Sequence, residues 1–370
     1  MRNIKDFLFT TLFCFLSLVV INPIFAADED FQSFVKKEKE KFSSFIDEQE
    51  KDYAAYQEAV RAKWGEFIGS SKKVWVDYGE KKESRSQVDF KAGKISIEVL
   101  IPKDEKNPRQ AASEKIKRQL KRMMSDQWPT GKNLLSGQVS VDGKKTLSTK
   151  NVDEFVVQHL KQKLKISSKL IPQESAPPKR VVSVEVQMVP EHLRIRAERY
   201  KSTVLKYCKQ RNIDPSVVFG LIHTESYFNP MARSHVPAYG LMQLVPVSGG
   251  RDAYKRVFKE DKKPSPKFLY NPENNINLGV GYLDLTKNVY FKGIENPGIA
   301  YLLTVAAYNT GAGNVARALT GKTRLKPAVK KAQTMTTEDI HEALRKKLPY
   351  KETQDYIQRV FRRSEIYRGL

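Results

Sequence analysis

The octapeptide HTESYFNP, residues 223–230, places a glutamate on the apolar face of a helix and then ends that helix with Asn-Pro. An Asp-Pro pair at 214–215 supplies the N-cap and the first-turn proline with which the helix begins. Glu225 follows Leu221 by four residues and Ile222 by three, so its side chain continues the inward face. Because an ionised carboxylate in a core is costly, a glutamate at such a position is usually paired, protonated or functional.

The surroundings of Glu225 predict a carboxyl whose pKa is raised. The C-terminal end of a helix carries partial negative charge, and the aromatic neighbours Tyr227 and Phe228 disfavour the charged form. A carboxyl that stays protonated near neutral pH can serve as a general acid. The alternative interpretation is a structural glutamate that is buried in an ion pair with an arginine.

Further motifs follow Glu225 along the chain. They are ES-x-FNP-x-A-x-S at 225–234, YGLMQ at 239–243, NPENNI at 271–276, AAYNTGAGN at 306–314 and YKETQDYI at 350–357. In this order and at these spacings, residues 190–370 resemble the lytic transglycosylases of the goose-lysozyme superfamily. The N-terminal half resembles the N-terminal domain of the membrane-bound lytic murein transglycosylase C subfamily.

The resemblance implies a mainly α-helical, goose-type lysozyme-like fold for residues 190–370, with one glutamate, Glu225, for both proton transfers. As an acid, Glu225 would protonate the glycosidic oxygen between N-acetylmuramic acid and N-acetylglucosamine. As a base, it would take the proton of the muramoyl 6-hydroxyl, which attacks the anomeric carbon and leaves a 1,6-anhydromuramoyl end. Two alternatives stay open: a muramidase that hydrolyses the same bond with water, and a glycan-binding scaffold with weak turnover.

The sequence gives no sign of a second catalytic carboxyl, a metal or a cofactor. No other acidic residue lies within the ES-x-FNP-x-A-x-S motif around Glu225, whereas ordinary glycosidases use two carboxyl groups. Glu273, Asp284 and Glu352, farther along the chain, are interpreted as loop or cap residues. No zinc-ligand spacing such as H-E-x-x-H occurs, and the G-x-G at 311–313 lacks the strand and the third glycine of a dinucleotide site. We therefore expect an enzyme that works without cofactor or metal.

The resemblance also assigns supporting roles around Glu225. Three residues are expected to support the carboxyl: Ser234, Gln243 and Tyr308. Among these, Ser234 is expected to hydrogen-bond the N-acetyl region or polarise the glutamate, and the Tyr308 hydroxyl is expected to reach the carboxyl. Four residues are expected to bind the sugars: Met242, Asn309, Tyr350 and Tyr356. For each of them the alternative is core packing or turn formation.

The N-terminus, residues 1–26, has the pattern of a secretory signal peptide. Basic residues precede an apolar run over 7–21, and the I-F-A at 24–26 fits a cleavage site. We expect cleavage after residue 26 and export to the periplasm or cell envelope, with outer-membrane association as an option. An uncleaved anchor helix and lipidation of Cys14 are the alternatives.

Residues 27–189 predict an α+β domain with a long first helix, and the domain boundary is placed near Pro190. The first helix is expected over 28–68 and to pack on its own domain rather than form a partner-binding coiled coil. Strands are expected at 73–77, 86–90, 94–101, 137–141 and 181–188, helices at about 111–124 and 152–164, and a loop at 171–178.

The formal net charge of +23 predicts a polyanionic partner. Export counts against nucleic acid and favours peptidoglycan glycan strands and anionic membrane surfaces. Basic residues form a stripe on the helix predicted near 111–124: Lys115, Lys117, Arg118, Lys121 and Arg122. We expect the domain of residues 27–189 to hold the enzyme on sacculus or membrane while residues 190–370 carry out catalysis. The alternative is that these lysines only solvate the domain.

Overall fold

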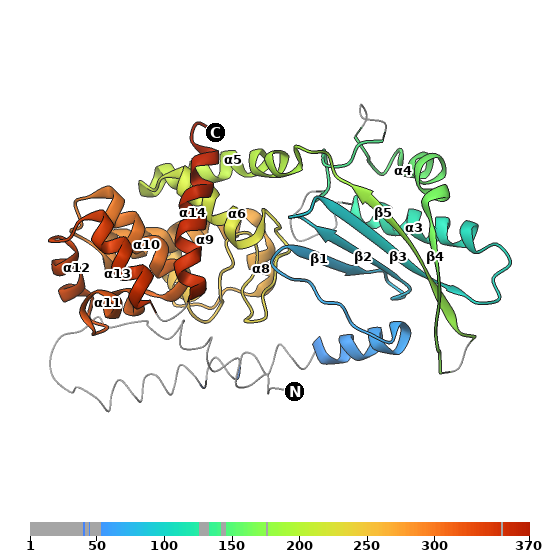
Figure 1. Ribbon diagram of the computed structural model, residues 1–370, viewed down its shortest axis with the longest axis horizontal. Coiled ribbons are helices and arrows are strands. Elements are labelled where there is room, and N and C mark those ends of the chain that lie inside the picture. The colour runs from blue at the N-terminus through green and yellow to red at the C-terminus, as the bar shows by residue number, and fades with distance from the viewer. Residues whose placement is uncertain are drawn as a thin grey trace.

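The computed structural model describes residues 40, 44, 53–125, 133–141, 146–174, 177–348 and 351–370. A sheet and its covering helices form one half of the molecule, and a cluster of helices forms the other (Figure 1). Three expectations fall outside the described residues: the signal peptide, the first part of the helix predicted over 28–68, and the side chain of Tyr350.

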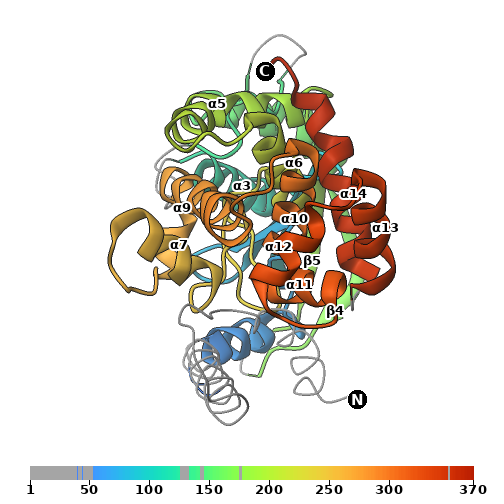
Figure 2. The same ribbon diagram turned by 90° about the vertical axis from the view of Figure 1, so that its left-hand side faces the viewer.

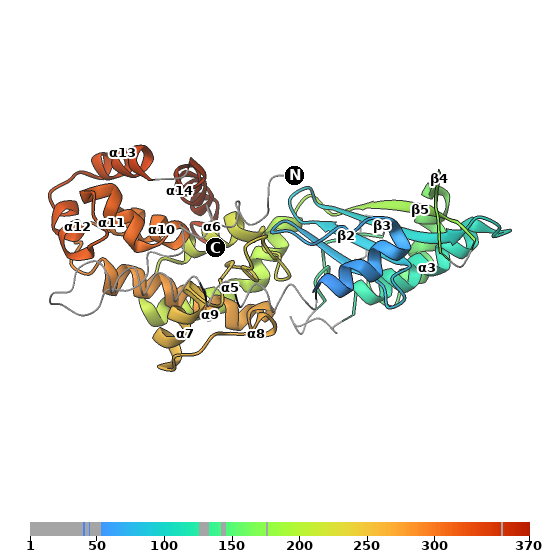
Figure 3. The same cartoon turned by 90° about the horizontal axis from the view of Figure 1, so that it is seen from below.

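The N-terminal half is built on a five-stranded antiparallel sheet with the order β1-β2-β3-β5-β4. Its strands are β1 (Val74–Tyr78), β2 (Ser84–Asp89), β3 (Lys94–Pro102), β4 (Lys165–Ile171) and β5 (Lys179–Gln187). Alternation along β3 buries Ile95 and Ile97 in the core that includes α3 (Pro108–Met123). Leu100 belongs to a second cluster, where it packs with residues of the helix at 53–64 (Figure 3).

Most of the elements predicted for this half are confirmed. The four strands with an alternating apolar pattern are β1, β2, β3 and β5, each within two residues of its predicted ends. The predicted helix near 111–124 is α3, which begins earlier because Pro108 occupies its first turn. The chain is helical from 152 to 163, as α4 (Val152–Phe155), the π-turn η1 (Val156–Leu160) and the 3₁₀ turn η2 (Lys161–Lys163).

Two details differ from the sequence prediction. The prediction of a strand at 137–141 is wrong, because the segment forms turns and has a single β-bridge, from Ser140 to Thr146. Strand β4 was not predicted. It lies at the edge of the sheet with most of its side chains exposed or half-exposed, so it lacks the apolar alternation that reveals a strand with a buried face.

The C-terminal half is helical and surrounds one core. Its elements are α5 (His192–Arg211), α6 (Pro215–Ser226), α7 (Gly249–Phe258), α8 (Pro266–Tyr270), α9 (Pro272–Leu285), η3 (Thr286–Tyr290), α10 (Pro297–Thr310), α11 (Ala312–Thr320), α12 (Leu325–Ala332), α13 (Thr337–Lys347), α14 (Lys351–Ser364) and η4 (Glu365–Tyr367). No helix in the described ranges is long and apolar enough to cross a membrane.

Helix α6 is the most enclosed element of this half. Ten of its twelve residues are buried, and it lies between α5 and α14 (Figure 2). The backbones of α6 and α14 approach so closely at Gly220 that a Cβ there would stand 2.6 Å from the carbonyl oxygen of Val360. Only glycine fits at this point of contact.

A buried arginine joins the two halves where α5 leaves the sheet. Arg196 is 1% exposed, and its guanidinium donates to the carbonyl oxygen of Phe90 at 2.7 Å and to Oε1 of Gln138 at 2.7 Å. Its Nε donates to the carbonyl oxygen of Tyr227 at 3.1 Å. Burial lowers the pKa of Arg196 to about 10. The sheet, the loop at 133–141 and the end of α6 are therefore held together by one side chain.

Candidate active site

The helix that carries Glu225 begins as the sequence predicts, but it ends at Ser226, three residues before the Asn229-Pro230 pair that was expected to stop it. Asp214 caps it by accepting a hydrogen bond from the amide of Ser216 at 2.8 Å, and Pro215 occupies its first turn. The chain leaves the helix through Tyr227, whose φ of 53° is left-handed. Glu225 is 5% exposed, so the inward orientation expected from its spacing is confirmed.

The carboxylate of Glu225 is paired with a lysine from the N-terminal half. Lys72 Nζ donates to Glu225 Oε2 at 3.2 Å. The negative charge of Glu225 raises the pKa of Lys72. The sequence had suggested an arginine as the partner of a structural glutamate. No local pattern marks Lys72, because 153 positions separate the two residues and only the fold brings them together.

Two buried tyrosines lie near the Glu225 carboxyl. The Tyr356 hydroxyl, on α14, lies within hydrogen-bonding reach of the Glu225 carboxyl, although the contact lacks good hydrogen-bond geometry. Burial, and next the charge of Glu225, raise the pKa of Tyr356 and of Tyr308 well above the ordinary tyrosine value. Both hydroxyls are therefore neutral over the range in which a carboxyl titrates.

Tyr308, on α10, was expected to reach the carboxyl with its hydroxyl. In this structure the hydroxyl instead donates to the carbonyl oxygen of Met242 at 2.8 Å. The side chain of Met242 is fully buried, and a Cβ on Gly279 would clash with its sulfur. Met242 therefore faces the site with its backbone carbonyl, while its side chain belongs to the core.

Gln243 adopts a left-handed backbone with φ of 50° at the end of the YGLMQ motif. Its Nε2 donates to the carbonyl oxygens of Gly240 at 2.9 Å and Ala232 at 3.2 Å. Its Oε1 is buried and has no partner among the described residues. The side chain of Gln243 is therefore fixed, and its Oε1 can accept a hydrogen bond from a ligand.

Gln243 and Tyr308 also line a common pocket. The remaining lining residues are Leu244, Val245, Gly249, Tyr282 and Gly311. An apolar and aromatic wall with a few fixed polar groups is typical of a small-molecule or sugar site. The charge of Glu225 also acts on Tyr308, so one wall of the pocket is within electrostatic range of the buried carboxyl.

The other expected site residues lie in different settings. The Ser234 hydroxyl donates to the carbonyl oxygen of Val236 and accepts from the amide of Ala238 at 3.2 Å, so it shapes its own loop. Asn309 is half-buried beside Tyr308 near the end of α10. No group of three potential metal-ligating side chains occurs in the described part of the chain.

Comparison with known proteins connects these features to a family. Residues 35–199 match the N-terminal domain of membrane-bound lytic murein transglycosylase C, and residues 202–329 match the transglycosylase SLT domain. Membrane-bound lytic murein transglycosylase C of Mannheimia succiniciproducens is 32% identical over 316 residues, which cover 82% of this chain and 85% of that protein. The chain belongs to this family. It is a lytic murein transglycosylase.

Other relatives agree with this assignment. The transglycosylase C of Pectobacterium atrosepticum is 32% identical over 315 residues, covering 82% of this chain and 86% of that protein. The 70 kDa soluble lytic transglycosylase of Escherichia coli is 26% identical, but the match covers 46% of this chain and 24% of that one, with a TM-score of 0.35. That score is too low to support a structural argument. The predicted order of an α+β domain followed by a mainly helical transglycosylase domain is confirmed.

Proposed function

We propose that this transglycosylase uses Glu225 as its single acid–base catalyst to cleave the β-1,4 bond between N-acetylmuramic acid and N-acetylglucosamine. Glu225 first donates its proton to the glycosidic oxygen, and the C–O bond to the anomeric carbon breaks. Glu225 then accepts the proton of the muramoyl 6-hydroxyl as that oxygen bonds to the anomeric carbon. The product carries a 1,6-anhydromuramoyl end, and no water is consumed.

The observation that carries this proposal is the isolation of Glu225 among the buried carboxyl groups. In the described residues, three carboxylates are buried as whole side chains: Asp77, Glu225 and Asp284. Asp252 is half-buried, and its charge acts on the buried Tyr282 and on Tyr290. Arg122 binds Asp77 within the sheet half, and Arg256 binds Asp284 at 2.7 Å, so both already have structural roles. A glycosidase that activates water or forms a covalent intermediate needs a second free carboxyl within about 5 to 10 Å of the first. The intramolecular route needs only one, and proximity of the 6-hydroxyl favours it.

Other residues of the site support this chemistry in the proposal. The free Oε1 of Gln243 accepts an N–H or O–H from the sugar, and the Tyr356 hydroxyl donates to Glu225 or to the substrate. Tyr308 and Met242 fix the wall between pocket and carboxyl through their hydrogen bond. Asn309 and Tyr350 bind sugar at the edge of the site, and Ser234 acts through the shape of its loop.

We also propose that residues 1–26 are a signal peptide and that the enzyme works in the periplasm or cell envelope, attached to an anionic sacculus or membrane through residues 27–189. These relatives are named membrane-bound lytic murein transglycosylases, which agrees with such an attachment. The basic stripe on α3 contributes less than its charge suggests, because carboxylates pair with four of its five members: Lys115, Lys117, Lys121 and Arg122. Residues 27–189 contain 32 Lys and Arg and 25 Asp and Glu, a formal net charge of +7, and in this proposal the attraction of the domain rests on that charge as a whole.

The test is the product released from purified sacculi by the wild type and by Glu225→Gln. We expect anhydromuropeptides from the wild type, lighter by one water than hydrolysed products, and almost no release by the variant. The amide keeps the shape of the side chain but cannot donate and recover a proton. Reducing muramic acid ends as the main product would establish a muramidase, and wild-type release by Glu225→Gln would refute the assignment of the catalyst.

A further inference from the structure

The N-terminal domain places a charged side chain directly on the catalytic carboxyl. Lys72 Nζ lies 3.2 Å from Glu225 Oε2, and the side chains are 38% and 6% exposed. Among the described residues, Lys72 is the cation in ion-pair contact with Glu225. Lys72 lies in the turn that precedes β1, outside the SLT domain match at 202–329.

The backbone of Lys72 is held from both sides. The amide of Ser71 donates to the carbonyl oxygen of Val74 at 2.8 Å, which closes the turn before β1. The carbonyl oxygen of Lys72 accepts a hydrogen bond at 3.4 Å from Nδ2 of Asn229, the asparagine of the HTESYFNP motif. Lys72 is therefore fixed beside Glu225 by the same segment that follows the catalytic helix.

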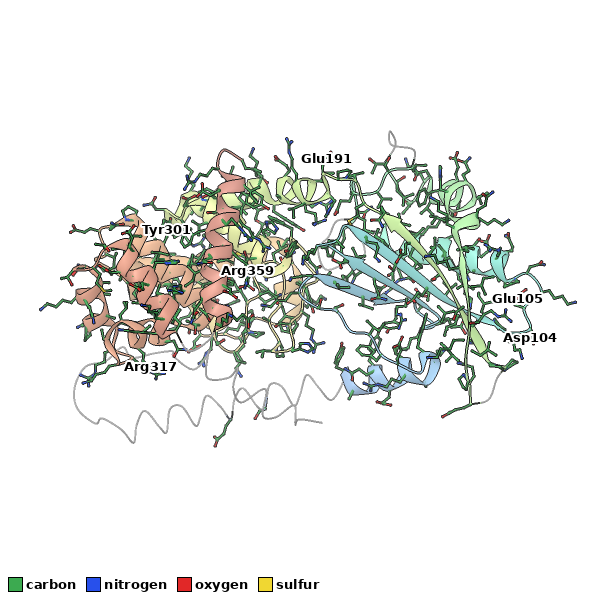
Figure 4. All side chains as sticks on the ribbon, viewed as in Figure 1. Asp104, Glu105, Glu191, Tyr301, Arg317 and Arg359 are labelled. Carbon is green, nitrogen blue, oxygen red and sulfur yellow. The ribbon has the colours of Figure 1, made fainter. Side chains whose placement is uncertain are left out.

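The segment that follows Glu225 is held against the N-terminal half at further points. The Arg233 guanidinium stacks on the Tyr53 ring at 4.1 Å, and Tyr227 and Met231 pack against the core of the sheet half. Arg196 binds the Tyr227 carbonyl oxygen on the same side of the junction. Figure 4 shows this junction where α5 begins, with Glu191 labelled between the halves. The contacts between the two domains therefore hold Lys72 in its position beside Glu225.

We propose that Lys72 is a positioning residue through which the N-terminal domain controls the protonation state of the catalytic Glu225. This inference rests on the proposed acid–base role of Glu225. A positive charge in contact with a carboxyl favours its ionised form. Lys72 therefore opposes the acid step and supports the base step, in which Glu225 accepts the 6-hydroxyl proton. It sets the upper pH limit at which free enzyme still holds the proton that it must donate.

The other groups around the pair do not replace this charge. Tyr308 of α10 and Tyr356 of α14 face Glu225, and burial raises the pKa of both, so they stay neutral. On the Lys72 side, α14 contributes Glu352, which favours the ammonium, and Arg359, which opposes it; Figure 4 labels Arg359 on this helix. The charge of Glu225 raises the pKa of Lys72, so Lys72 is protonated whenever Glu225 is ionised.

The experiment is the pH profile of kcat/KM for the full chain with the variants Lys72→Met and Lys72→Arg, measured on soluble glycan strands. The alkaline limb reports loss of the proton from the free enzyme's essential acid. Without the cation, the protonated carboxyl persists to higher pH, so the limb of Lys72→Met should move up by about one pH unit. Lys72→Arg keeps the charge and should retain the wild-type limb. Lys73→Met is the matched control, since Lys73 stacks on Tyr227 and makes no ion pair with Glu225.

Each outcome decides the inference. An unmoved alkaline limb in Lys72→Met overturns it, whether turnover is normal or reduced, because a merely structural lysine would change kcat without moving the limb. If Lys72→Met does not fold, Lys72→Gln is measured in the same way. Glu225→Gln separates the two proposals: activity in that variant refutes the catalyst itself, whereas an inactive Glu225→Gln with an unmoved Lys72→Met limb refutes only the role of Lys72.

Discussion

Replacing Gly220 with alanine should force α6 and α14 apart and destabilise the catalytic domain. An alanine Cβ would lie 2.6 Å from the carbonyl oxygen of Val360 and 2.8 Å from the amide nitrogen of Ser364. Both are backbone atoms, so no side-chain rotation relieves the contact. Overpacking of this kind costs up to about 3 kcal/mol, while the better helix propensity of alanine returns about 1 kcal/mol. The expected net loss is about 2 kcal/mol.

Thermal unfolding followed by circular dichroism measures this loss. A domain of this size loses about 2–4 °C in Tm for each kcal/mol, so Gly220→Ala should unfold about 4–8 °C below the wild type. Turnover should fall as well, because α14 carries Tyr356 and α6 carries Glu225, and a displacement of about 1 Å in a site can cost a hundredfold in rate. Gly298→Ala is the control, since no backbone atom is among the contacts of its Cβ. A Gly220→Ala protein that is as stable as the wild type would refute the close contact between the helices.

Three further predictions concern the tyrosine, the histidine and the charge. Tyr356→Phe should retain its Tm, since the hydroxyl makes no hydrogen bond of good geometry in the described residues, but its release of muropeptides from sacculi should fall about tenfold or more; unchanged release would exclude a catalytic hydroxyl. Burial lowers the pKa of His223 to about 3, so the unfolded chain binds a proton more readily and stability is lost as the pH falls from about 6.5 towards 3. His223→Gln should therefore show a shallower decline of Tm over that range, and an equal decline would contradict the cause. Sedimentation of Glu225→Gln with sacculi should decrease between low and high salt, because ions screen exposed charges beyond about 8 Å at physiological ionic strength; binding that ignores salt would exclude electrostatic attachment.

The position of Glu225 could be predicted because it depends on local rules alone. Helix spacing predicts an inward side chain, and the Asp-Pro pair marks the start of the helix. The end was placed three residues too late, because the left-handed Tyr227 and Phe228 stop the helix before the Asn-Pro pair. The strands with one buried face could be predicted for a similar reason, since apolar and polar residues alternate along a strand that is buried on one face. Strand β4 could not, because its pairing with β5 uses the backbone and most of its side chains remain exposed.

The partners of Glu225 could not be predicted, because they depend on how distant segments meet. Lys72 lies in a short polar turn whose residues look like solvated surface in the sequence. Its role exists only because the turn docks against Asn229. The hydrogen bond of Tyr308 to the Met242 carbonyl has the same origin, since the motif predicts a tyrosine near the carboxyl but not which acceptor it chooses.

The buried guanidinium of Arg196 limits how freely the two domains can be recombined. Its three oxygen acceptors come from Phe90, Gln138 and Tyr227, two of them outside the catalytic domain. A chimaera that joins this catalytic domain to a foreign N-terminal domain would leave the charge enclosed with one of these acceptors, at a cost of several kcal/mol. We expect successful exchanges to transfer the segments around residues 90 and 138 together with α5, or to replace the arginine with an apolar residue. The unit that must be exchanged intact therefore includes part of the sheet as well as the helices of the catalytic domain.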